Sequence, residues 1–303
     1  MGVPRSLAVV IGVALGVVLG VALTALGLGA PALATPAPER ETVRVMFVGD
    51  SLTGSPGCWR APVWVSLTDA GYDLEMVGIN TVNECGDVTN TIGSAWDPDN
   101  TGIGGATSTR AWVKLARDKV LEQYQPQVIV QLLGTNDLLG GSSADAVLEQ
   151  YDKLLELYRD YNPSVTVVVG TPPPIDSGVC GCDAAQSALA ATLPGWAQGV
   201  STAESPVFDA DLSSGFDPAV DTDDGIHPND SGNAVLAAAW TPVIEDALDA
   251  ALEAVPASPS ATPDEPIPTD AYPPATPSAV WVLVGLLLVA LGVGAAVARS
   301  RNR

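Results

Sequence analysis

The chain has 303 residues, of which 47% are hydrophobic and 16% are charged, and this is enough for one α/β domain with additional segments. It carries 35 acidic and 13 basic side chains, and its formal net charge is −22. Since a surface of this charge repels nucleic acids and anionic lipid headgroups, a role in nucleic-acid binding is excluded.

Residues 1–34 contain one basic and no acidic side chain and are dominated by a long apolar run. Ala32-Leu33-Ala34 ends the run with small residues at the spacing that signal peptidase accepts. Because the run is longer and richer in glycine than a usual signal core, it predicts either a cleaved signal peptide or an uncleaved signal anchor. Residues 35–42 are a short linker to the next segment.

The first predicted strand begins at Val43 and is an alternating, β-branched run that is typical of a buried strand. Gly49 ends it, and Asp50 and Ser51 follow directly. Ligands of open α/β sheets bind at the carboxyl ends of the strands, so Ser51 is a candidate nucleophile. A serine hydroxyl needs an imidazole-like base to react at neutral pH, and His227 is the only histidine in the chain.

The elements that follow alternate between helices and strands. Helices are predicted over residues 60–70, 109–123, 184–199 and 231–252 and after the capping residue Ser143, and strands over residues 73–77, 128–133, 165–169 and 206–209. Pro194 lies within one of these helices and favours a kink or a break there, and residues 80–105 are a long polar loop. Continuously apolar strands separated by helices indicate a mostly parallel sheet that is covered on both faces. The predicted fold is therefore a three-layer α/β/α sandwich formed by residues 43–254.

Three of the predicted loops carry polar groups at strand ends. Asn136 follows the third predicted strand, and its side-chain amide can donate to a negatively charged oxygen, as acyl transfer requires. Gly105 ends the long polar loop and lets a backbone N–H approach as a second donor. Asp224 lies three residues before His227, so one loop can hold the carboxylate against the imidazole and fix its tautomer.

Taken together, these blocks resemble those of the SGNH, or GDSL, hydrolases. The lettered residues of that motif correspond to Ser51, Gly105, Asn136 and His227, and Asp224 completes the triad. The resemblance covers nearly the whole predicted domain and implies the flavodoxin-like fold of that superfamily. It also implies an oxyanion hole formed by the backbone N–H groups of Ser51 and Gly105 and the side chain of Asn136, without a cofactor or a metal ion.

The surroundings of these blocks resemble a narrower family. Residues 49–60, which read Gly-Asp-Ser-Leu-Thr-Gly-Ser-Pro-Gly-Cys-Trp-Arg, and residues 221–229, which read Asp-Thr-Asp-Asp-Gly-Ile-His-Pro-Asn, are similar to segments of carbohydrate esterase family 3, the acetylxylan esterases. This resemblance implies an acylated carbohydrate as the substrate, with acetyl as the acyl group. Those enzymes usually carry a histidine before the Gly-Gly of the second block, where this chain has Ile103, so the departure concerns the substrate and not the hydrolysis. Ile103 and Asp50 are expected to contact the substrate.

Two other functions remain open. A lysophospholipase or a broad-specificity carboxylesterase or lipase would use the same triad but needs an apolar acyl groove, and the acidic domain argues against an anionic lipid. A surface glycan-binding protein with an inactive site is the third possibility, and the complete triad and oxyanion set argue against it. The sequence does not indicate the oligomeric state or the natural polymer.

The chain contains four cysteines, which in an exported protein are expected to be oxidised. Three pairings are possible, and we favour Cys58 with Cys85 and Cys180 with Cys182, because each pair closes a local loop. A zinc site is the alternative, but it would need all four thiolates because the single histidine has another role. No metal ion is therefore expected.

The C-terminal part has the composition of a tethered stalk. Residues 255–278 are rich in Pro, Ala, Ser and Thr and predict a semi-extended stalk. Residues 279–298 carry no charge and are long enough to cross a bilayer. Arginines follow in the basic tail at 299–303, which the positive-inside tendency places in the cytoplasm. The sequence thus predicts an exported domain that is anchored to the membrane by a C-terminal helix.

Overall fold

The structure is a computed structural model that describes residues 41–254. The predicted signal segment, stalk, membrane-spanning helix and basic tail all lie outside these residues. Within residues 41–254, no helix combines the length and the apolar character that a membrane crossing requires.

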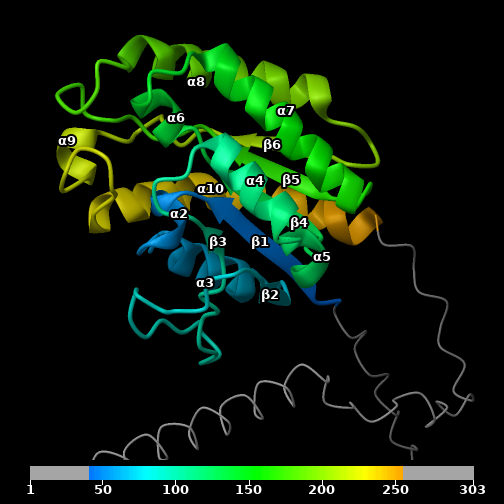
Figure 1. Ribbon diagram of the computed structural model, residues 1–303. Helices are drawn as coiled ribbons and strands as arrows, with labels where there is room; N and C mark the ends of the chain where they lie inside the picture. Colours follow the sequence, from blue (N-terminus) through cyan, green and yellow to red (C-terminus); the bar gives the residue numbers. More distant parts are fainter. Residues whose placement is uncertain (1–40, 255–303) are drawn as a thin grey trace, which may run out of the picture. The chain divides into compact units, whose positions relative to one another are not determined.

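Parallel strands form the centre of the domain (Figure 1). The described residues contain a six-stranded sheet with the order β2-β1-β4-β5-β6, and the short β3 also pairs with β1. All pairs are parallel, and β1, β4 and β5 are buried almost throughout because both faces of the sheet are covered. The strands are β1 (Val43–Gly49), β2 (Leu74–Met76), β3 (Thr101–Gly102), β4 (Val128–Leu132), β5 (Thr166–Gly170) and β6 (Val207–Ala210).

Helices pack on both faces of this sheet, which gives the fold three layers. Successive side chains of a strand point to opposite faces: Val45 and Phe47 belong to the core under α3 and α10, and Met46 and Val48 to the core under α4, α5, α7 and α8. The predicted three-layer α/β/α fold is therefore confirmed. The helices are α2 (Ser51–Gly54), α3 (Arg60–Ala70), α4 (Ser108–Arg117), α5 (Val120–Tyr124), α6 (Thr135–Leu139), α7 (Ala144–Tyr161), α8 (Asp183–Val200), α9 (Pro218–Asp221) and α10 (Asp230–Ala254).

The helix predicted over residues 109–123 is in fact two helices. The backbone N–H of Asp118 donates to the carbonyl of Lys114 at the end of α4. Lys119 then adopts a left-handed conformation with a φ of +52°, which turns the chain before α5 begins. The turn lets Val120 and Leu121 reach the core, where each is only 1% exposed. Burial of these two side chains therefore decides where the helix breaks.

Two further elements differ from the sequence prediction. The long loop at 80–105 contains β3, which has only two residues and is held by its pairing with the end of β1. Pro194, which favoured a kink or a break, lies inside α8, so the helix does not break there.

The four cysteines form two local disulfides. Cys58 pairs with Cys85 and Cys180 pairs with Cys182, as the sequence favours. These bonds leave no thiolate for the alternative zinc site. In the part of the chain that the structure describes, no three His, Cys, Asp or Glu side chains are grouped to hold a metal ion.

Candidate active site

Three strand ends bring the predicted site residues together at the carboxyl edge of the sheet. Ser51 is the first residue of α2, and only Asp50 separates it from the end of β1. The register pairs the end of β1 with Gly102 of β3 and with Leu132 of β4. The loop that carries Gly105 and the short helix α6, which carries Asn136, therefore start beside the serine. This is the edge at which open α/β sheets bind their ligands.

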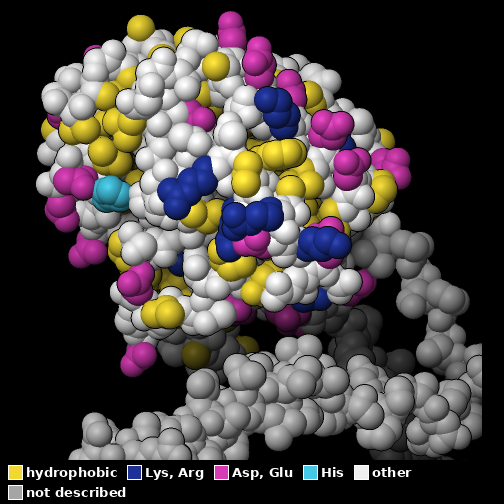
Figure 2. Space-filling view, in the orientation of Figure 1, with side chains coloured by type: hydrophobic (Ala, Val, Ile, Leu, Met, Phe, Trp, Pro, Cys, Tyr) yellow, Lys and Arg dark blue, Asp and Glu magenta, His cyan; other side chains and the backbone are white. Residues whose placement is uncertain are grey.

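The side chains of Ser51, His227 and Asp224 form a hydrogen-bonded chain. The Nε2 atom of His227 lies 2.9 Å from the Oγ atom of Ser51, and its Nδ1 atom lies 2.7 Å from the Oδ2 atom of Asp224. When Nδ1 carries the proton and donates to the carboxylate, Nε2 is the acceptor for the serine hydroxyl. Figure 2 shows the histidine at the molecular surface, where a substrate can reach it. The arrangement can remove the serine proton during attack on an ester.

Asp224 is held in its ionised form by hydrogen bonds from its own loop. Its Oδ1 atom accepts from the backbone N–H groups of His227, at 2.8 Å, and Ile226, at 3.0 Å. These contacts, with the backbone N–H of His227 as the largest, lower the pKa of Asp224 to about 2. The carboxylate is therefore charged at neutral pH and can stabilise an imidazolium at His227.

A turn from another part of the chain supports the loop that carries the acid and the histidine. Gly225, between these two residues, has a φ of +83°, a conformation that favours glycine. A Cβ atom at this position would come within 2.8 Å of side-chain atoms of Asp176 and Val179. The backbone N–H of Asp176 also donates to the carbonyl of Gly225 at 2.8 Å. No pattern in the sequence predicts this support, because it depends on a contact between separate loops.

Asn136 and Gly105 are the predicted oxyanion donors besides the backbone N–H of the serine. Asn136 is half-buried, and its amide nitrogen donates to the Oδ2 atom of Asp50 at 2.9 Å. An amide nitrogen carries two hydrogens, so the second remains for a substrate oxygen. Gly105 is exposed, and a Cβ atom there would have no neighbour within 4 Å. The space around its backbone is therefore open to a substrate.

The prediction that Asp50 contacts the substrate is wrong. Its side chain is 0% exposed, so no surface is left for a substrate to touch. Its Oδ1 atom accepts from the backbone N–H of Leu52 at 2.9 Å, which caps α2, and its Oδ2 atom accepts from Asn136. Burial raises the pKa of Asp50 to about 6. Asp50 therefore orients Asn136 and the serine helix and does not touch the reacting groups.

Ile103 lies in the same loop as Gly105 and is half-buried. Its backbone N–H donates to the carbonyl of Gly49 at 2.9 Å, and its contact with a substrate stays a prediction. A groove of about 410 Å³ borders this loop and the end of α2. It is lined by Gly54, Ser55, Ile79, Asn80, Thr81, Val82, Glu84, Gly102 and Gly104.

Comparisons with known proteins point to ester hydrolysis. Residues 47–235 match the model of the GDSL-like lipase/acylhydrolase family. A multidomain esterase of Ruminococcus flavefaciens is 27% identical to the chain over 226 residues, which is 69% of this chain. The chain spans only 29% of the length of that relative.

Solved structures of carbohydrate esterases are similar over nearly their whole length. A carbohydrate esterase of family 3 from Talaromyces cellulolyticus is 33% identical, with a TM-score of 0.59, and the match covers 68% of this chain and 99% of that one. An acetyl esterase variant with an acetate ion gives the same identity, TM-score and coverage. A family 3 carbohydrate esterase of Clostridium thermocellum is 26% identical, with a TM-score of 0.58, and the match covers 69% of this chain and 98% of that one.

Proposed function

Because the chain belongs to the GDSL-like lipase/acylhydrolase family and is therefore an ester hydrolase, we propose that it removes short acyl groups, acetyl above all, from a carbohydrate. The observation that carries the proposal is the chain of hydrogen bonds from Asp224 through His227 to Ser51. A serine with such a base becomes a nucleophile. An ester carbonyl that enters the open edge of the sheet is the group that it attacks.

In the proposed reaction, the Oγ atom of Ser51 attacks the ester carbonyl carbon while the Nε2 atom of His227 takes the hydroxyl proton. Asp224, which is charged at neutral pH, stabilises the resulting imidazolium. The imidazolium gives the proton to the leaving alcohol oxygen, and the acyl group stays bonded to the serine. The same imidazole then activates a water molecule that hydrolyses the acyl-enzyme and restores the hydroxyl.

The tetrahedral intermediate carries a negative oxygen that needs fixed donors. The backbone N–H groups of Ser51 and Gly105 and the free amide hydrogen of Asn136 serve as these donors. Asp50 holds the other amide hydrogen of Asn136 at 2.9 Å, so the direction of the free one is set before the reaction begins. Donors that are fixed in advance cost no reorganisation when charge develops.

Two observations support an acetylated carbohydrate as the substrate. The solved relatives at 26–33% identity are named as an acetyl esterase and as carbohydrate esterases of family 3, and they align over nearly their whole length. The groove beside α2 offers the polar side chains of Ser55, Asn80 and Glu84, which suit the hydroxyl groups of a sugar. The groove would hold the part of the substrate that leaves as an alcohol.

The proposal includes action outside the cell. Its support is the uncharged segment at 279–298, followed by three arginines, in the part of the sequence outside the described residues. The two disulfides agree with this, because such bonds persist in oxidising compartments.

Hydrolysis of p-nitrophenyl esters of increasing acyl length tests the choice of acyl group. Burial of each added methylene of the acyl chain contributes about 0.8 kcal/mol to binding where the acyl pocket has room for it. A preference for acetyl therefore requires a pocket too short for longer acyl chains. We expect acetyl esters to be cleaved faster than butyryl esters, and octanoyl esters hardly at all. Ile103→Ala, which removes a bulky side chain near Gly105, should shift the preference toward butyryl. A wild-type preference for octanoyl esters would replace the carbohydrate substrate with a lipid.

A further inference from the structure

Arg60 is a buried charge that no step of the proposed reaction uses. It is 2% exposed and is the first residue of α3. The N-terminus of a helix carries a partial positive charge, so a cation is disfavoured there. Burial lowers the pKa of Arg60 to about 10, which leaves it charged at neutral pH. A buried cation in such a place needs strong compensating contacts.

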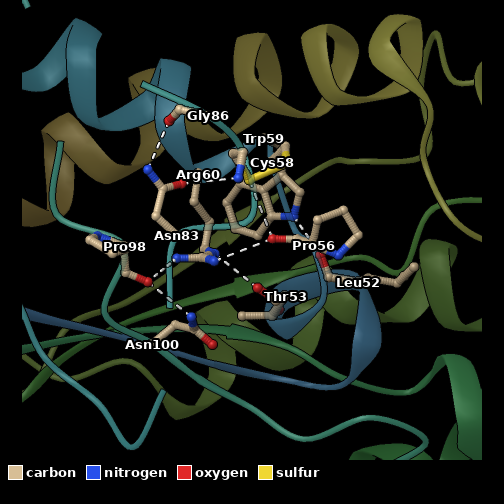
Figure 3. The surroundings of a disulfide bond; sticks show 11 residues. Leu52, Thr53, Pro56, Cys58, Trp59, Arg60, Asn83, Gly86, Pro98 and Asn100 are labelled. Atoms are coloured by element: carbon tan, nitrogen blue, oxygen red, sulfur yellow. Dashed lines mark hydrogen bonds between the residues drawn. A yellow bond between two sulfur atoms is a disulfide. The ribbon is translucent and has the colours of Figure 1, made fainter. Parts of the chain in front are cut away.

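Backbone carbonyl groups from two segments of the site accept hydrogen bonds from Arg60 (Figure 3), and the nearby charges of Asp97 and Asp99 also favour the charged guanidinium. The Nε atom of Arg60 donates to the carbonyl of Thr53 at 2.8 Å, and its Nη1 atom donates to the carbonyl of Pro98 at 2.8 Å. The carbonyl of Pro56 accepts from Nη2 at the longer distance of 3.5 Å. Thr53 lies in α2, which begins at Ser51, whereas Pro98 lies in the loop that leads into β3.

Further hydrogen bonds connect Pro98 to the segment that precedes Gly105, the predicted oxyanion glycine. The carbonyl of Pro98 also accepts from the side chain of Asn100 at 3.0 Å, as Figure 3 shows. The Oδ1 atom of Asn100 accepts from the backbone N–H of Gly102 at 2.9 Å. Gly102 lies three residues before Gly105. One path of hydrogen bonds therefore runs from the serine helix through Arg60 to the strand that precedes the glycine loop.

We propose that Arg60 is a positioning residue that holds the serine helix and the glycine loop at a fixed separation. The proposal rests on the proposed function, in which the backbone N–H groups of Ser51 and Gly105 bind the same oxyanion. The planar guanidinium has five donors in a rigid fork and can serve carbonyl groups in several directions, which the single ammonium of a lysine does not reproduce. A displacement of about 1 Å between reacting groups can lower a rate by about 10²-fold.

Arg159, which is half-buried, offers a control with similar hydrogen bonds. Its Nε atom donates to the hydroxyl of Ser205 at 3.0 Å, and its Nη2 atom donates to the carbonyls of Val200, at 2.8 Å, and Ser205, at 2.9 Å. Val200 is the last residue of α8, and Ser205 lies just before the start of β6. In a parallel sheet the start of a strand is at the edge opposite to the site. Arg159 therefore ties loops together by similar contacts but touches no segment of the site.

The test compares Arg60→Met and Arg60→Lys with Arg159→Met and Arg159→Lys. For each folded variant, kcat and KM for p-nitrophenyl acetate and the Tm are measured, and kinetics are recorded well below the Tm. We expect both Arg60 variants to lower kcat, by about 10–10²-fold for Arg60→Met, with little change in KM, because the oxyanion forms only after binding. Both Arg159 variants should lower the Tm and leave kcat unchanged. The lysine variants keep the comparison possible if a methionine variant does not fold.

An unchanged kcat in a folded Arg60 variant would overturn the proposal. An equal loss of kcat in the Arg159 variants would also overturn it, because the loss would then follow from stability alone. Wild-type protein and Ser51→Ala are measured alongside. Hydrolysis that survives Ser51→Ala contradicts the proposed function itself, and this result is distinct from either outcome for the arginines.

Discussion

Asp50 and Asp224 are two carboxylates near one serine whose surroundings shift their pKa values in opposite directions. Burial raises the pKa of Asp50 to about 6, whereas backbone N–H groups, led by that of His227, lower the pKa of Asp224 to about 2. Asp224 therefore stays charged beside the imidazole over a wide range of pH. Asp50 lies away from solvent and supports the amide of Asn136.

The raised pKa of Asp50 predicts a pH dependence of stability. The pKa of Asp50 is near 3.8 in the unfolded chain, so the folded protein binds this proton more tightly. The protonated carboxyl therefore contributes its full stabilisation below about pH 4, and this stabilisation is lost as the pH rises through about 6. The loss is on the order of 3 kcal/mol. Urea unfolding of the wild type and of Asp50→Asn at about pH 4 and about pH 7 measures this loss. The difference in unfolding free energy between the two proteins is compared at the two pH values, because the other titrating groups cancel in that difference. Relative to the wild type, the variant should gain stability as the pH rises. A difference that is independent of pH would show that Asp50 does not titrate as described.

Asn136→Ala is predicted to lower kcat by about 10²–10³-fold with little change in KM. The amide donates to an oxygen that becomes negative only in the transition state, so its loss does not weaken substrate binding. Steady-state kinetics with an acetyl ester measure both constants. An increase in KM at constant kcat would instead identify Asn136 as a substrate-binding residue.

At the scale of elements, the loop that carries His227 depends on its packing against the turn at 176–179. Gly225→Ala places a Cβ atom within 2.8 Å of side-chain atoms in that turn and also disfavours the φ of +83°. We expect it to lower both stability and kcat, because the imidazole moves away from the serine. Gly215→Ala is the matched control, since Gly215 has a φ of +82° but nothing within 4 Å of a Cβ atom. The control should lose about 1 kcal/mol of stability from strain and keep its kcat. Equal kcat in the two variants would show that the packing does not position the histidine.

The sequence predicts well those helices and strands whose ends are set by residues within the element or next to it. The helix at 60–70 has the same bounds in the structure, because Gly71 ends it in a left-handed conformation with a φ of +99°. The break at Lys119 carries no such signal, since a lysine with positive φ is held there by the burial of the residues that follow. The two-residue strand β3 exists only through its pairing with β1, which a local pattern does not reveal.

In the candidate active site, too, local sequence patterns predict some residues, whereas contacts between distant segments determine others. Ser51, Asn136 and His227 could be predicted because each follows a recognisable strand or belongs to a short motif. The role of Asp50 in orienting Asn136 could not, because these two residues are 86 positions apart in the sequence and meet only in the folded chain. Arg60 appears in a recognised motif, yet its role depends on loops that meet only in the folded chain.

For the whole molecule, the sequence of the terminal segments predicts that the domain lies outside the cell and is attached to the membrane. Protease added to intact cells that express the full chain should release an active fragment cut within residues 255–278, because a stalk rich in proline and small residues is accessible to proteases. Activity in the medium and the mass of the fragment measure the release. Cells that retain all activity until they are lysed would contradict the proposed orientation.

Ser51 and His227 are proposed to act as one catalytic unit, and a comparison of the two single variants with the double variant tests this. The kcat for an acetyl ester is measured for Ser51→Ala, His227→Ala and the double variant, with Tm values to show that each is folded. We expect each single variant to lose nearly all turnover and the double variant to lose no more, because neither group functions without the other. Oxyanion donors and substrate binding alone can accelerate hydrolysis by roughly 10³-fold over the reaction in water. A turnover of His227→Ala well above that rate would show that the histidine is not the catalytic base.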